Sequence, residues 1–249
     1  MKFKLPLATV LCLSVMTNVA QAEYKVRSPI VESGELGLET VGNIGSDRNP
    51  AKNNAKSSVV ELEYGVNDFW MTELEGEWGR DPGPGDAEKF LATTFGNQFQ
   101  IFPQGEKWLD VGFWTEYSMA SKKTDADKIK FGPLAQKSFG DFTATANFYL
   151  EKQIGANAVG GTDATYAAQL KYDWLRWLDP AIEAHGDIGY INQNTVPKDQ
   201  THLVGPVMVG QISLGSAGEI KYELGYLVGI STATPESTFK WKLEYEIAF

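Results

Sequence analysis

The sequence predicts an all-β fold, a single transmembrane antiparallel β-barrel of about twelve strands with short periplasmic turns and longer extracellular loops. Three observations lead to this fold class. Apolar and polar residues alternate with a period of two along most of the chain, tight turns alternate with longer polar connections, and the N-terminus has the pattern of an export signal.

The first 22 residues are expected to form a cleaved signal peptide. Lys2 and Lys4 give it a positive start, an apolar stretch follows from Leu5 to Met16, and Ala20-Gln21-Ala22 has the small-x-small pattern of a cleavage site after Ala22. The apolar stretch is shorter than the ~20 residues that a membrane-spanning helix needs. Cys12 is the one cysteine and lies in this segment. We therefore expect no disulfide and no thiol-based site in the exported chain.

The charge balance limits the possible partners. The chain has 32 acidic and 22 basic residues, a formal net charge of −10, and the signal peptide would remove two of the lysines. Nucleic-acid-binding proteins need basic patches. The composition therefore argues against a nucleic-acid partner.

Alternation with period two is clear in several windows, because successive side chains of a strand point to opposite faces. Apolar residues occupy every second position of Tyr222–Val228, of Trp241–Phe249 and of Leu109–Phe113. Residues 23–33 are expected to be a short periplasmic lead, and residues 34–249 the barrel. Strands are expected near 34–45, 57–65, 69–78, 88–102, 107–117, 128–138, 142–154, 163–176, 181–192, 201–214, 219–231 and 237–249.

The connections between these strands predict the topology. Tight, Gly-, Asn-, Asp- or Pro-rich turns are expected at 66–68, 103–106, 139–141, 177–180 and 215–218. The alternate connections are mostly longer and more polar, at 46–56, 79–87, 118–127, 155–162, 193–200 and 232–236. Short turns at one end and long loops at the other are typical of membrane barrels, and an even number of strands places both termini on the periplasmic side.

A soluble periplasmic β-sandwich or lipocalin-like barrel would show the same alternation with its apolar face inward. Three features favour the membrane barrel. The polar face carries many charges beside Gly and Ala, and the chain ends on an alternating strand with an aromatic residue, Phe249. The apolar face also has aromatic residues near strand ends, namely Trp70, Trp78, Tyr117, Trp174, Tyr190, Trp241 and Tyr245.

The final strand, Leu243–Phe249, resembles the terminal strand of Gram-negative outer-membrane β-barrels. That resemblance implies an outer-membrane location, contact with membrane lipid, and Phe249 as a signal for the barrel-assembly machinery. The stretch Glu61–Asp68 resembles a hairpin of transporter-like channel barrels, including those associated with phenol-degradation operons. This second resemblance supplies no site residues.

The polar face predicts an acidic lumen in which carboxylates outnumber lysines. Two hypotheses follow: a channel that passes or binds small solutes and prefers cations, or a solvated interior braced by Lys–Glu pairs. A non-conducting structural or adhesive barrel acting through its extracellular loops is the alternative function. The basic loop 46–56 is a candidate to fold inward onto the acids. The lumen candidates are Glu35, Glu39, Glu61, Glu63, Glu73, Glu75 and Glu77.

Glu183, His185 and Asp187 form a second polar group, because their i, i+2, i+4 spacing puts them on one face of a strand. A lone histidine in a hydrogen-bonded wall is favoured over a metal site, which would need a further ligand from a neighbouring strand. The sequence contains no nucleophile elbow, zinc-protease motif or nucleotide-binding loop. We therefore predict no enzyme, no catalytic or metal residues and no cofactor, and a lipid-modifying enzyme is the less favoured alternative.

Overall fold

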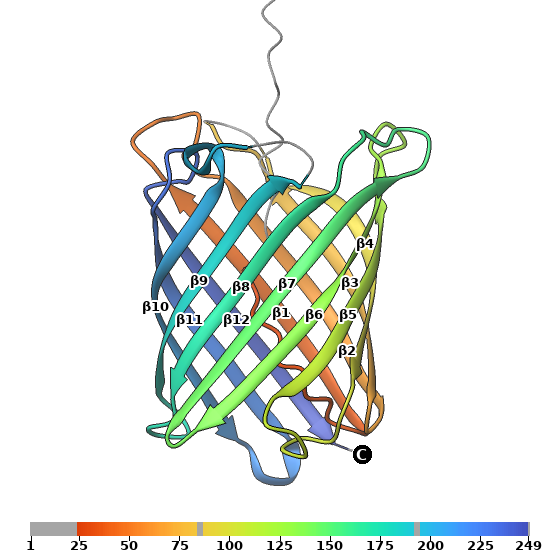
Figure 1. The fold of residues 1–249 in the computed structure, drawn as a ribbon, viewed down its shortest axis with the longest axis vertical. Helices are drawn as coiled ribbons and strands as arrows, with labels where there is room; N and C mark the ends of the chain where they lie inside the picture. The colour runs from red at the N-terminus through yellow and green to blue at the C-terminus, as the bar shows by residue number, and fades with distance from the viewer. Residues whose placement is uncertain (1–23, 84–86, 192–194, 249) are drawn as a thin grey trace, which may run out of the picture.

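The computed structural model describes residues 24–83, 87–191 and 195–248. Within them, antiparallel strands close into a twelve-stranded barrel, in which β1 pairs with both β2 and β12 (Figure 1). The predicted signal peptide and Phe249 lie outside the described residues. The strands are β1 (Glu35–Ser46), β2 (Lys56–Asn67), β3 (Trp70–Arg80), β4 (Lys89–Gln100), β5 (Asp110–Ala120), β6 (Asp127–Phe139), β7 (Phe142–Ile154), β8 (Asp163–Tyr172), β9 (Asp179–Tyr190), β10 (Thr201–Ser213), β11 (Glu219–Gly229) and β12 (Ser237–Ala248).

The apolar face of the strands points out of the barrel. Along β2, Val60 and Leu62 are exposed while Val59 and Glu61 are buried, and the same alternation recurs along β11 and β12. Tyr117, Trp174 and Tyr245, predicted for the lipid face, are exposed. An apolar exterior around a polar interior is the arrangement of a membrane barrel and the reverse of a soluble one. No helix in the described parts of the chain has the length and apolar character to span a membrane.

The turns and loops follow the predicted alternation, but several bounds shift, and the turn between β8 and β9 spans residues 173–178 rather than 177–180. Short turns join β2 to β3 and β6 to β7, where Gly140 adopts a φ of 59°. The turn between β4 and β5 is longer than predicted: it spans residues 101–109 rather than 103–106. The Gly105 N–H donates to Asp110 Oδ1 at 2.6 Å, which keeps the residues before β5 in the turn.

Residues 24–33, which we call the N-terminal segment, lie inside the barrel rather than outside it as a periplasmic lead. Figure 1 shows this stretch, at the red end of the colour scale, within the ring of strands before β1 begins. Lys25 and Arg27 are only 8% and 6% exposed. The Gly34 N–H donates to the Gly65 carbonyl oxygen at 2.8 Å, where the segment leads into β1 beside β2.

Candidate functional site

The first part of the site is an ammonium site on β1 and β2. Antiparallel register places Glu39 opposite Glu61, and the alternation turns both side chains, with Glu63, into the lumen. Lys25 Nζ lies 2.7 Å from Glu39 Oε1, 2.5 Å from Glu61 Oε2 and 2.9 Å from Glu63 Oε1. Burial and the nearby Arg27 both lower the pKa of the Lys25 ammonium, but the three carboxylates outweigh them and raise this pKa well above its ordinary value.

The second part is a guanidinium site on β3 and β5. Arg27 donates through both terminal nitrogens to the two carboxylate oxygens of Glu73, at 2.9 and 2.8 Å, and lies 3.6 Å from Glu75 Oε1. Its guanidinium carbon is 3.9 Å from the centroid of the Trp114 ring. A planar guanidinium can donate two parallel hydrogen bonds to one carboxylate and also stack on an aromatic ring. An ammonium group cannot do both.

Side-chain amides hold the backbone of the N-terminal segment. The Arg27 N–H donates to Asn147 Oδ1, and Asn147 Nδ2 donates back to the Arg27 carbonyl, both at 2.8 Å. The Val31 N–H donates to Gln100 Oε1 at 2.8 Å, and Gln98 Nε2 donates to the Ile30 carbonyl at 3.1 Å. These wall residues satisfy backbone groups that burial would otherwise leave without partners.

Two glycines of the wall make room for this arrangement. A Cβ at Gly65 would lie 1.9 Å from the Glu32 carbonyl oxygen, so the segment passes where a side chain would stand. A Cβ at Gly96 would lie 2.5 Å from the Trp114 ring, so the ring occupies the space over this glycine of β4. The wall is thus shaped to fit both the segment and the indole that contacts it.

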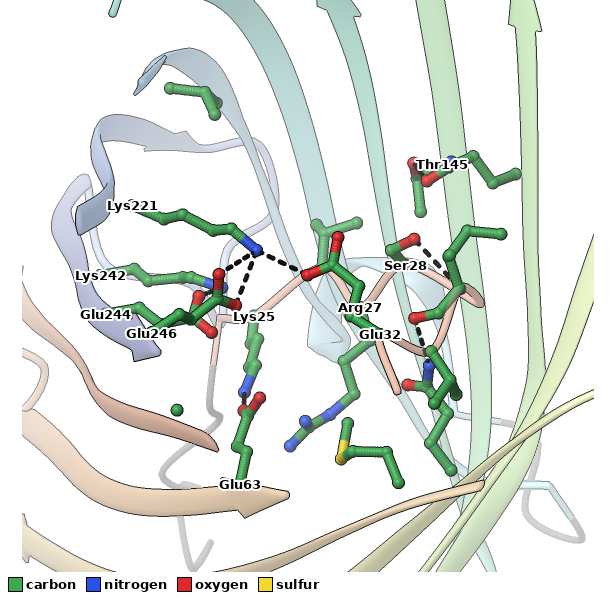
Figure 2. Close-up of a pocket in the computed structure, with 18 of the residues that line it drawn as sticks. Lys25, Arg27, Ser28, Glu32, Glu63, Thr145, Lys221, Lys242, Glu244 and Glu246 are labelled. Atoms are coloured by element: carbon green, nitrogen blue, oxygen red, sulfur yellow. Dashed lines mark hydrogen bonds and ion pairs between the residues drawn. The ribbon is translucent and has the colours of Figure 1, made fainter. Parts of the chain in front are cut away.

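A polar cavity of about 440 Å³ lies between the segment and the wall (Figure 2). Lys221 Nζ lies 2.5 Å from Glu246 Oε2 on the neighbouring strand β12 and 3.1 Å from Glu32 Oε2 of the N-terminal segment. A hydrogen bond with Glu35 lowers the pKa of the Glu32 carboxyl, and the charge of Lys221 lowers it further against the effect of burial. The cavity is lined mainly by charged and amide side chains, which suits hydrated solutes.

The predicted group Glu183, His185 and Asp187 is divided in the structure. His185 Nε2 lies 2.8 Å from Glu183 Oε2, and the Lys240 ammonium contacts the same oxygen at 2.7 Å. Tyr24, from the N-terminal segment, has its ring centroid 5.2 Å from that of His185. Asp187 instead accepts a hydrogen bond from the Gly189 N–H at 2.8 Å. Glu183 and His185 are therefore part of a hydrogen-bonded wall.

The seven predicted lumen acids do line the interior, and the structure brings five of them around Lys25 and Arg27. Glu35 borders the cavity and Glu77 accepts a hydrogen bond from Thr94. Among the described residues, three groups of acids are close enough to share a metal ion, and a lysine or arginine of the chain contacts each group. These groups are Glu32, Glu35 and Glu246; Glu39, Glu63 and Glu244; and Glu61, Glu73 and Glu75.

Sequence reasoning missed the residues that occupy the lumen. Lys25 and Arg27 were assigned to an outside lead, although their i, i+2 spacing matches the spacing of the acids on the first strands and could have indicated a pairing. No pattern in the sequence indicated that Trp114 and Asn147 would contact the N-terminal segment. The loop 46–56 does not fold inward through its bases as expected: Lys52 instead contacts Asp47 and the Thr234 carbonyl of a neighbouring loop.

Comparison with known proteins supports the architecture. No family model matches the chain, and no curated protein matches its sequence. Among solved structures, an outer membrane channel from Pseudomonas putida F1 matches with a TM-score of 0.60 and 16% identity, covering 88% of this chain and 97% of that one. The fold is that of Gram-negative outer-membrane β-barrels. The translocator domain of autotransporter NalP from Neisseria meningitidis also matches, with a TM-score of 0.55 and 12% identity over 88% and 89% of the two chains. At these identities the likeness shows the fold alone.

Proposed function

We propose that the protein is an outer-membrane channel for small solutes that prefers cations, and that the N-terminal segment closes it in the conformation described. One observation carries this proposal. The wall formed by β1, β2 and β3 binds an ammonium and a guanidinium group of the chain itself, through five carboxylates that face the lumen. A wall that holds cations so closely would favour cations over anions once the segment withdraws.

The physical basis is the field of the acidic wall. In the closed state Lys25 and Arg27 compensate part of the negative charge, and Lys242 contacts Glu39 at 2.5 Å and Glu244 at 3.0 Å. Without the segment, the acids of β2 and β3 would lose both cations. A low-dielectric wall around a narrow aqueous path concentrates such a field and raises the local cation concentration. Salt screens exposed charges beyond about 8–10 Å, so the effect is confined to a constriction.

Conductance in planar bilayers tests both parts of the proposal. The double variant Lys25→Ala/Arg27→Ala is expected to open more often than the unaltered protein, and its reversal potential under a KCl gradient is expected to show cation preference. Adding Glu61→Gln and Glu75→Gln to that variant should weaken the preference, because two lumen charges are removed. Anion preference would contradict the proposal. Absence of conductance in every variant would favour the alternative, a structural or adhesive barrel that acts through its loops.

We propose no catalytic role for the lumen residues. His185 and Lys240 both contact Glu183, which fits a structural role for the imidazole. The apolar outer face would contact outer-membrane lipid, whereas the signal peptide and the recognition of Phe249 by the assembly machinery stay predictions from the sequence.

A further inference from the structure

The guanidinium group of Arg27 is enclosed by two carboxylates and one aromatic ring. Glu73 accepts two parallel hydrogen bonds from it, Trp114 lies against its face, and Glu75 contacts its edge at 3.6 Å. This arrangement is more than a cluster of acids, because an aromatic plane and a bidentate carboxylate select for one shape of cation. We call Glu73, Glu75 and Trp114 the guanidinium cage.

Contacts within the wall hold the guanidinium cage in place without the help of Arg27. The Trp114 Nε1–H donates to Glu116 Oε2 at 2.7 Å, a contact that does not involve Arg27. Gly96 leaves the space that the indole fills. Glu73 and Glu75 lie on β3, which pairs with β2 and with β4 without a register shift from Met71 to Glu77. A site that is already ordered binds its ligand at a lower entropic cost.

From this geometry we propose that the guanidinium cage is a binding site for solutes that carry a guanidinium group, with Arg27 as a tethered occupant that such solutes compete with. The inference rests on the proposed channel function, since solutes must reach the lumen, and it names the class of solute that this part of the wall would recognise. The neighbouring ammonium site around Lys25 would favour solutes with a second positive charge.

Arginine itself provides the model for selectivity within this class. Methylguanidinium can form both hydrogen bonds to Glu73 and stack on Trp114, as Arg27 does. Methylurea has the same planar shape but no charge and fewer donors, so it would leave the carboxylate without a cation. The pair of compounds therefore separates recognition of the guanidinium from a general solvent effect.

The test empties the guanidinium cage in the full-length barrel with Arg27→Ala and adds methylguanidinium at millimolar concentration. The readout is the temperature at which the compact form, seen on gels of unheated samples, is lost. Methylguanidinium should raise this temperature by about 2–4 °C in Arg27→Ala, in a saturable manner, because binding to the folded state alone stabilises it. Methylurea and an equal concentration of NaCl should have no such effect.

Three controls decide the outcome. The unaltered protein should not respond, because Arg27 already occupies the guanidinium cage. Arg27→Ala/Glu73→Gln should lose the response and Arg27→Ala/Trp114→Leu should weaken it. If Arg27→Ala does not fold, Arg27→Ser, which offers a hydroxyl group to Glu73, replaces it. An equal response in the unaltered protein, or in Arg27→Ala/Glu73→Gln, would overturn the inference.

Binding and conductance are measured separately, so the two proposals can fail independently. A barrel that conducts but does not respond to methylguanidinium would overturn this inference and leave the channel proposal standing. A saturable response in a barrel that never conducts would support the guanidinium cage as a binding site and contradict the channel.

Discussion

Lys240 on β12 and Glu183 on β9 form an ion pair past two intervening strands, with Nζ 2.7 Å from Oε2. Neither residue has any exposed surface, and Lys240 also contacts Glu223 on β11 at 3.0 Å. The pair ties together a wall whose inner surface is otherwise apolar at Leu203 and Val207. A charge held in this environment depends on its partner far more than a surface charge does.

Lys240→Met should therefore destabilise the barrel by about 3–5 kcal/mol, because it leaves Glu183 and Glu223 without their lysine. Denaturant unfolding of the refolded protein measures this loss. Adding Glu183→Gln should recover part of it. Arg48→Met is the matched control, since Arg48 and Glu236 are 91% and 51% exposed and 3.6 Å apart, and its effect should stay within about 0.5 kcal/mol. Equal losses in both lysine and arginine variants would refute the bracing role.

Lys25→Met should loosen the N-terminal segment. It removes the cation that three carboxylates contact, at 2.5 to 2.9 Å, and leaves the buried Glu61 without that partner. Open probability in bilayers should rise and the unfolding temperature should fall. Lys52→Met removes a lysine that contacts Asp47 in an extracellular loop, and it should change neither quantity. If Lys25→Met changed neither open probability nor unfolding temperature, the backbone hydrogen bonds alone would keep the segment in the lumen.

The contribution of Lys25 to the closed state should not change from about pH 7 to pH 10. The pKa of Lys25 is raised above its ordinary value of 10.5, so its contribution to docking is complete below that pH. The contribution is lost only as the pH rises through the raised pKa, because deprotonation removes the charge that the carboxylates bind. The difference in conductance between the unaltered protein and Lys25→Met should stay constant across this range and shrink only above it. A difference that already shrinks between about pH 8 and pH 10 would contradict the raised pKa of Lys25.

Gly65→Ala should displace the segment at its junction with β1. A methyl group there would lie 1.9 Å from the Glu32 carbonyl oxygen, so the hydrogen bond between Gly34 and Gly65 would have to open. Added protease should then cleave the segment faster than in the unaltered protein. Gly160→Ala serves as the control, because no heavy atom lies within 4 Å of a Cβ at that position. Identical cleavage rates in the two variants would contradict the close packing of the segment against Gly65.

Phe249→Asp should reduce insertion into the outer membrane. This prediction depends on the terminal position of Phe249 on an alternating strand and on the family resemblance. The amount of heat-modifiable barrel in outer-membrane fractions measures it. Val159→Asp, at an exposed position in the connection between β7 and β8, introduces the same charge and should leave the yield unchanged. Equal yields of the two variants would remove Phe249 as an assembly signal.

Local pattern was enough to predict the strands. The stretch predicted at 219–231 is β11 at Glu219–Gly229, and the one at 237–249 is β12 at Ser237–Ala248. The predicted acids face inward because alternate side chains of a strand point to opposite faces, so the residues between those that face lipid must face the lumen. The turn before β5 was misplaced, because the bond that shapes it joins Gly105 to the side chain of Asp110 rather than following from turn residues alone.

The sequence by itself determined the barrel and its twelve strands, since both depend on alternation and turn composition within a few residues. Tertiary structure alone decided what occupies that interior. Arg27 meets Asn147 across 120 residues of chain and Glu73 across 46, and no periodicity encodes such distances. Pairing of β1, β2 and β3 brings their acids onto one wall, and barrel closure encloses the lumen in front of it. The combined field of these acids makes the lumen, rather than the periplasm, the stable place for two basic side chains.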